Sequence, residues 1–185
     1  MKSMSVSKKI CTAAICVALC YVLPVILHSV GGGHAFSPMH FPVLLCGLLC
    51  GPLYGALCGV VGPVISSVLS GMPQAPQLIS MIPELVVYGI VSGILFKFVR
   101  TKSIYANLYI SLIPAMIAGR IAGGIVKSFV YLSNAESYSV SLWVGSYIIK
   151  TFPGIIAQLI IIPMLVFALI KSNVIESPEV LKTYE

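Results

Sequence analysis

Long apolar runs separated by short polar segments dominate the sequence. Six runs can be marked, at about residues 10–30, 41–51, 53–70, 80–99, 106–131 and 141–170. Most are long enough to cross about 30 Å of hydrocarbon as α-helices. The second run meets the third at Gly51-Pro52 with almost no connection, which predicts a tight hairpin. The pattern predicts an all-α membrane protein, a compact bundle of six transmembrane helices in one integral membrane domain over residues 1–185.

Composition supports this class and charge gives an orientation. Only 9% of the residues are charged and 58% are hydrophobic, whereas a soluble domain carries roughly 25% charged residues. The basic residues outside the runs flank ends that share one side in a six-span chain: Lys2, Lys8, Lys9, Lys97, Arg100, Lys102, Lys171 and Lys182. The opposite loops, about 31–40, 71–79 and 132–140, contain no Lys or Arg. The positive-inside rule therefore predicts N-in/C-in topology with both termini cytoplasmic, and the net charge of +6 indicates no nucleic-acid partner.

Four ionisable residues interrupt the apolar runs: Glu84, Arg120, Lys127 and Lys150. A charge inside hydrocarbon is costly, so such a residue usually faces a cavity, a partner or a solute. In the predicted topology Glu84 lies one turn below the outer surface, and Arg120 lies roughly 16 Å below the outer end of its span. Lys127 is one turn from that end, and Lys150 is within roughly 15 Å of the same surface. All four are thus expected in the outer half, on the fourth to sixth spans.

These charges predict an outward-opening pocket with polar groups on an apolar and aromatic wall. Arg120 and Lys127 share a helical face, and Tyr88 follows Glu84 by one turn. A purely structural alternative pairs Glu84 with Arg120 or Lys150 while Lys127 reaches the lipid headgroups. That alternative cannot neutralise the set, because three cations face one carboxylate. The cationic excess favours an anionic ligand.

The histidines and cysteines do not form a pattern that is typical of a metal site. The first outer loop combines Gly31–Gly33 with His28, His34 and His40, and it is either a connector or a lid over a cavity. The histidine spacing is irregular, and no carboxylate cluster completes a site with them or with the six cysteines. No metal and no cofactor is predicted.

Three local motifs resemble a known family, the substrate-binding S components of energy-coupling factor (ECF) vitamin transporters. The first run carries Ala14-x-x-x-Ala18, similar to the small-residue motif with which that family docks on its transmembrane T component. The stretch His40-Phe-Pro-Val-Leu-Leu-Cys-Gly-Leu-Leu-Cys-Gly-Pro-Leu-Tyr-Gly55 resembles the family's H-x-P-V-x-x-x-G-x-x-x-G-P-x-x-G segment. Gly119-Arg120 with Gly123-Gly124 resembles its fifth helix.

The resemblance implies a high-affinity capture subunit for a small water-soluble vitamin or precursor in a bacterial cell membrane. It further implies a T component and two ATP-binding-cassette ATPases as partners. The chain itself has no Gly-x-x-x-x-Gly-Lys-Ser/Thr phosphate loop, so ATP-driven import would need such partners. By the resemblance, the first and third outer loops and the fourth to sixth spans bind the substrate. The expected binding residues are His34, Phe36, Gln74, Gln77, Glu84, Tyr88, Arg120, Lys127, Trp143, Tyr147 and Lys150.

Other functions remain as alternatives. A stand-alone secondary transporter or channel for a small polar solute would need polar groups in the inner half as well. The second and third runs contain no charge, and below Lys150 the sixth offers mainly Gln158. An intramembrane enzyme is not expected, because the sequence has no His-Glu-x-x-His, no Gly-x-Ser-x-Gly and no paired intramembrane carboxylates. A non-transporting assembly subunit would use the buried charges only for packing.

Overall fold

Six helices make up most of the described chain. The computed structural model describes residues 5–29, 37–99, 101, 103–133, 145 and 151–171, and within these ranges there is no strand. The helices are α1 (Val6–Ser29), α3 (His40–Cys50), α4 (Pro52–Ser70), α5 (Ala75–Phe98), α6 (Ile104–Ser133) and α8 (Phe152–Lys171). The all-helical class predicted from the apolar runs is confirmed for this part of the chain.

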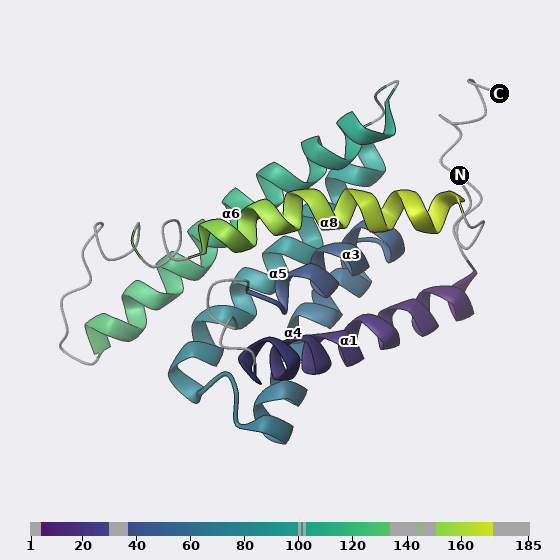
Figure 1. The fold of residues 1–185 in the computed structure, drawn as a ribbon. Helices are drawn as coiled ribbons and strands as arrows, with labels where there is room; N and C mark the ends of the chain where they lie inside the picture. Colours follow the sequence, from purple (N-terminus) through teal and green to yellow (C-terminus); the bar gives the residue numbers. More distant parts are fainter. Residues whose placement is uncertain are drawn as a thin grey trace.

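Five of these helices are long and apolar enough to cross a membrane, namely α1, α4, α5, α6 and α8. The remaining helix, α3, has 11 residues and is therefore roughly 16 Å long, about half the hydrocarbon thickness. The count of six spans and the N-in/C-in topology therefore stay predictions. Figure 1 shows that α1 begins and α8 ends at the same end of the bundle.

Glycine and proline set the ends of the helices. Gly51, with φ of 98°, separates α3 from α4, and Pro52 occupies the first turn of α4. Gly71, with φ of 70°, ends α4 in the left-handed conformation, and its N–H donates to the Ser67 carbonyl at 2.9 Å. The expected hairpin at Gly51-Pro52 is confirmed. Pro63 does not end α4, which continues through it to Ser70.

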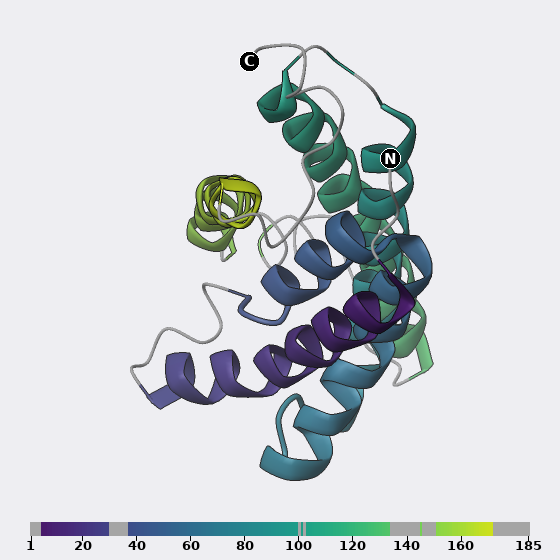
Figure 2. The ribbon, with the colours of Figure 1, turned by 90° about the vertical axis from the view of Figure 1, so that its right-hand side faces the viewer.

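The centre of the bundle is α5, which packs against α3, α4 and α6. Helix α1 covers α3 and α4, and α8 lies across α3 and α6. Figure 2 shows α8 nearly along its axis, with α3 between it and α1. The backbones of α4 and α5 are in close contact, which is possible because Gly55 and Gly89 have no Cβ. A Cβ at either position would overlap the facing backbone. The four-residue glycine spacing is therefore a packing device, as expected for helices in lipid.

One end of the bundle brings together the segments that form the candidate site. There α1 ends, α3 begins and the turn from α4 to α5 lies close to both, since all three line one cavity. Hydroxyl groups hold this turn in place. Ser66 Oγ donates to the Met72 carbonyl at 2.8 Å, and Ser67 Oγ donates to the Pro73 carbonyl at 2.8 Å. We call this end the cavity end.

Candidate functional site

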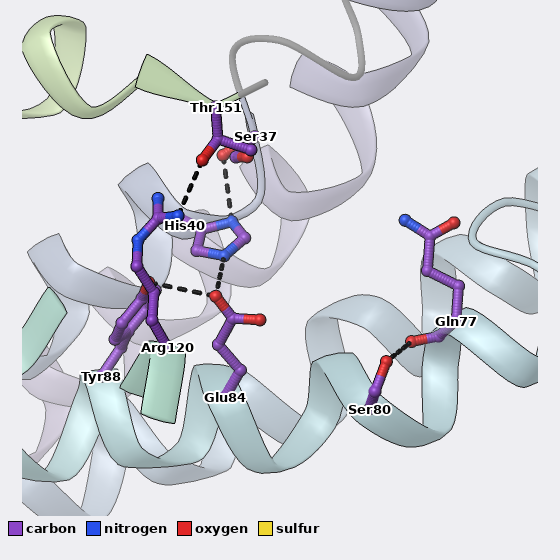
Figure 3. Close-up of polar contacts among 8 residues, drawn as sticks. All are labelled: Ser37, His40, Gln77, Ser80, Glu84, Tyr88, Arg120 and Thr151. Carbon is purple, nitrogen blue, oxygen red and sulfur yellow. Dashed lines mark hydrogen bonds and ion pairs between the residues drawn. The ribbon is translucent and has the colours of Figure 1, made fainter. Parts of the chain in front are cut away.

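A row of side chains along α5 runs inward from the cavity end. Gln77, Met81, Glu84 and Tyr88 follow one another at four, three and four residues, so they share a helical face. Gln77 and Met81 line the cavity, whereas Glu84 and Tyr88 are buried below it. Figure 3 shows the side chains of Gln77 and Glu84 on the same side of α5. The face therefore leads from a cavity to a buried carboxylate.

Glu84 is the centre of a hydrogen-bonded group that joins two helices. Its Oε1 accepts a hydrogen bond from the Tyr88 hydroxyl at 3.1 Å and lies 3.2 Å from His40 Nε2 (Figure 3). His40 Nδ1 lies 3.1 Å from the Ser37 carbonyl, which can only accept, so Nδ1 carries a proton. The Glu84 carboxylate is thus paired inside the bundle with two side-chain partners, as buried polar groups usually are.

Helix α6 presses on this group through two glycines. A Cβ at Gly123 would lie 2.8 Å from Glu84 Oε2, and a Cβ at Gly119 would overlap the Tyr88 ring. Any larger residue at either position would displace the carboxylate or the phenol. These glycines let α6 approach α5, and Arg120 follows directly after Gly119 on α6.

Arg120 is a buried cation whose contacts are neutral. Its side chain is 7% exposed, its Nη1 donates to Thr151 Oγ1 at 2.7 Å, and its Nε is buried without a hydrogen-bond partner. Figure 3 shows the guanidinium turned toward Thr151 and away from the Glu84 carboxylate. Within the described residues the ion pair His40–Glu84 is present and Arg120 has none. A buried guanidinium of this kind suits an anion that comes from outside the chain.

The cavity at this end has a volume of about 260 Å³. Its wall comes from the end of α1, the start of α3, the turn between α4 and α5, and the first turns of α5. The lining residues are Pro24, His28, Ser37, Pro38, Met39, His40, Met72, Pro73, Gln74, Gln77 and Met81. His40 belongs to both the cavity wall and the buried pair, so it connects the two.

Several of the predicted site residues come together and others lie outside the described part. Gln74 and Gln77 line the cavity, and Glu84 and Tyr88 bind one another. Arg120 directly follows Gly119, which packs against Tyr88. Lys127 is half-buried on α6, two turns from Arg120. The predicted residues outside the described ranges are His34, Phe36, Trp143, Tyr147 and Lys150. The expected docking residues Ala14 and Ala18 are both exposed on α1.

Two features differ from the expectations. The structural alternative that paired Glu84 with Arg120 does not occur, because Glu84 binds His40 and Tyr88 instead. His40 was not among the predicted binding residues, although it lines the cavity. The available signal was an ionisable side chain at the very start of an apolar run, where the rule for intramembrane charges also applies.

One of three comparisons with known proteins places the chain in a family. The search of curated proteins gave no match, and neither did the search of solved structures. The family model described as "ECF transporter, substrate-specific component" matches residues 8–171. These residues include every described helix except the first two residues of α1. The chain belongs to the family of substrate-specific components of ECF transporters, which are multi-pass membrane transport proteins rather than enzymes.

Proposed function

We propose that this substrate-capture subunit binds a small, anionic, water-soluble vitamin or precursor at its cavity end, which faces the outside of the cell. Membership of the family makes the chain the capture subunit of an importer that contains a T component and ATPases. The nature of the ligand, its place and the N-in/C-in orientation are the proposal. The positive-inside distribution of Lys and Arg supports the orientation.

The observation that carries the proposal is the buried guanidinium of Arg120. Its one described partner is a neutral hydroxyl, and its Nε has none. The nearby carboxylate of Glu84 is already bound to His40 and Tyr88. An uncompensated buried charge costs several kcal/mol, and a ligand carboxylate would remove that cost. The same argument disfavours a cationic ligand at this position.

The exposed face of α1 supports a separate docking surface. Ala14 and Ala18 are exposed, whereas Cys16 and Cys20 on the other face are buried. Two small residues one turn apart would let a helix of the T component approach closely. Neither alanine lines the cavity. We therefore assign capture and docking to different surfaces.

Exchange of Arg120 for Gln tests the anionic ligand. We expect Arg120→Gln to weaken binding by about 10- to 100-fold, the range for a lost charge-assisted hydrogen bond. The purified protein is first examined by native mass spectrometry for a co-purifying compound. Its dissociation constant, and those of nicotinate, pantothenate, biotin and folate, are then measured by calorimetry.

Lys97→Gln is the matched control for this exchange. Lys97 lies in the last turn of α5, at the far end of that helix from the cavity, so the variant also loses one positive charge. We expect its affinity to equal that of the wild type. Equal affinities in Arg120→Gln and wild type would refute the anion site. Absence of any bound compound in wild-type protein would refute the capture of such vitamins.

The serine hydroxyls behind the turn from α4 to α5 offer a second test. The double variant Ser66→Ala/Ser67→Ala loses the two hydrogen bonds to the Met72 and Pro73 carbonyls. Each such bond contributes about 1 kcal/mol. We expect roughly 3- to 10-fold weaker binding of the same compound, because part of this energy orients the cavity wall. Ser128→Ala, which removes a bond to Gly124 within α6, is the control and should bind normally.

A further inference from the structure

The apolar part of the cavity wall consists of methionine and proline side chains. Three methionines and three prolines line it, on all the segments that meet at this end: Met39, Met72, Met81, Pro24, Pro38 and Pro73. Methionine sulfur makes favourable contacts with aromatic rings, and thioether side chains adapt to a planar surface. Proline rings also present an apolar face without a flexible chain. This combination suits the two faces of a planar ring.

The same wall carries neutral hydrogen-bonding groups. Gln74 and Gln77 each present an amide with two donors and one acceptor. Neither side-chain amide makes a hydrogen bond within the described residues, where both residues bond through backbone atoms. Figure 3 shows the Gln77 amide extended away from α5. Such amides can pair with the donor and acceptor groups at the edge of a heterocycle.

The described residues of the cavity wall include no acidic residue, lysine or arginine. Their polar side chains are imidazoles, amides and a hydroxyl. A charged ring bound there would lack a counter-ion and would be disfavoured. The ligand's negative charge must therefore lie elsewhere. Arg120 itself does not line the cavity. It lies on α6 between Gly119 and Gly123, which pack against Tyr88 and Glu84, and His40 joins Glu84 to the cavity.

The volume of the cavity is large enough for a small ring system. A volume of about 260 Å³ corresponds to roughly nine water molecules at about 30 Å³ each. A heavy atom with its hydrogens occupies a somewhat smaller volume than a water molecule. A one- or two-ring heterocycle fits this space.

We propose that the cavity binds the neutral, planar heterocyclic part of the ligand. Gln74 and Gln77 form hydrogen bonds with the edge of this ring, and the ligand's anionic group lies toward Arg120. This inference rests on the proposed function and narrows its substrate class to heterocyclic carboxylates or related anions. Open-chain ligands would not use the methionine and proline faces. Carbocyclic aromatic ligands would leave both amides unpaired.

Three bicyclic carboxylates of nearly equal size separate these possibilities. Pterin-6-carboxylate is planar and has donors and acceptors along its edge. Naphthalene-2-carboxylate is planar and has none on its rings, and decahydronaphthalene-2-carboxylate is neither planar nor polar there. Calorimetry on the purified full-length protein should give the pterin about 10-fold higher affinity than the naphthoate. The naphthoate should bind about 5-fold more tightly than its saturated form because of the sulfur–aromatic contacts.

The variants Gln77→Met and Gln74→Met test whether the preference for the pterin over the naphthoate arises in the cavity. Each removes an amide and keeps a similar volume, and each residue is exposed enough for the fold to survive. We expect at least one variant to lose about 10-fold in pterin affinity while naphthoate binding changes less than about 2-fold. Gln158→Met on α8, which lies outside the cavity wall, is the control and should keep the wild-type order.

Several outcomes would overturn the inference. Equal affinity for the three carboxylates would do so, and so would a pterin preference that survives in both glutamine variants. An open-chain vitamin as the co-purifying compound would refute the heterocycle and leave the capture of an anion intact. If Arg120→Gln loses binding but the wild type does not distinguish the three rings, the heterocycle proposal is wrong and the anion site still stands.

Discussion

Glu84→Ala is expected to lower the free energy of unfolding by about 3–5 kcal/mol, the largest loss that we expect from a single polar side chain among the described residues. The carboxylate is 5% exposed and is the shared partner of His40 and Tyr88. Its removal leaves an imidazole and a phenol buried without their acceptor, next to the guanidinium of Arg120. Thermal unfolding of the purified protein in detergent, followed by circular dichroism, measures the effect.

Glu84→Gln separates the hydrogen bonds from the charge. The introduced amide has the same length as the carboxylate and keeps an acceptor for the Tyr88 hydroxyl, so we expect a loss of only about 1–2 kcal/mol. A double-mutant cycle with His40→Ala measures the coupling directly. Contacting residues in one network couple by about 0.5–3 kcal/mol, and we expect the upper half of this range. A Glu84→Ala loss below about 1 kcal/mol, or additive effects in the cycle, would contradict the buried pair.

The helices were predictable because lipid imposes a simple requirement on the backbone. Every N–H and C=O in hydrocarbon must be bonded within the chain, so long apolar runs become helices. The start of α5 was less predictable: its run was expected from about residue 80, whereas the helix begins at Ala75. Pro76 lies in its first turn, where proline fits, and the polar Gln77 is already helical. Apolar periodicity does not detect such a polar first turn.

Several individual residues of the candidate site could be predicted from the sequence, but the contacts between residues of different helices could not. The rule for intramembrane charges identified Glu84 and Arg120, and the family resemblance added Gln74 and Gln77. Sequence spacing gives depth along one helix, but it gives no rotation between helices. His40 and Glu84 are 44 positions apart and meet because α3 packs on α5. The methionines of the cavity were missed for a similar reason, since an apolar residue in an apolar run carries no signal of its own.

The buried pair also leaves Arg120 without a carboxylate partner among the described residues. If Glu84 bound Arg120, the two charges would cancel and the site would have no preference for an anion. His40 instead takes the carboxylate, and the glycines at 119 and 123 hold α6 close to it. Arg120 is therefore left for the anionic ligand that we propose. Under that proposal, the preference for an anion would depend on a histidine that need not touch the anion.

Gly89→Val is expected to prevent folding, and Gly89→Ala to destabilise the protein by about 3 kcal/mol or more. A Cβ at Gly89 would overlap the backbone of Gly55, and it would lie 2.8 Å from the nitrogen of Ala56. Backbone atoms cannot relieve an overlap by changing rotamer as a side chain can, so α4 and α5 would have to move apart. That separation would open the contacts of the central helix with its neighbours. Gly89→Ala is measured by thermal unfolding in detergent, and Gly89→Val by its yield of monodisperse protein.

Val68→Ile serves as the matched control for Gly89→Ala, because it also adds a single carbon. Val68 is 79% exposed on α4, so the added methyl group meets lipid or detergent. We expect its unfolding temperature to match that of the wild type. Gly89→Ala should also lose ligand affinity, since α5 carries Gln77, Met81 and Glu84 and its displacement moves all three. Wild-type stability in Gly89→Ala would show that α4 and α5 do not approach as closely as Gly55 and Gly89 allow.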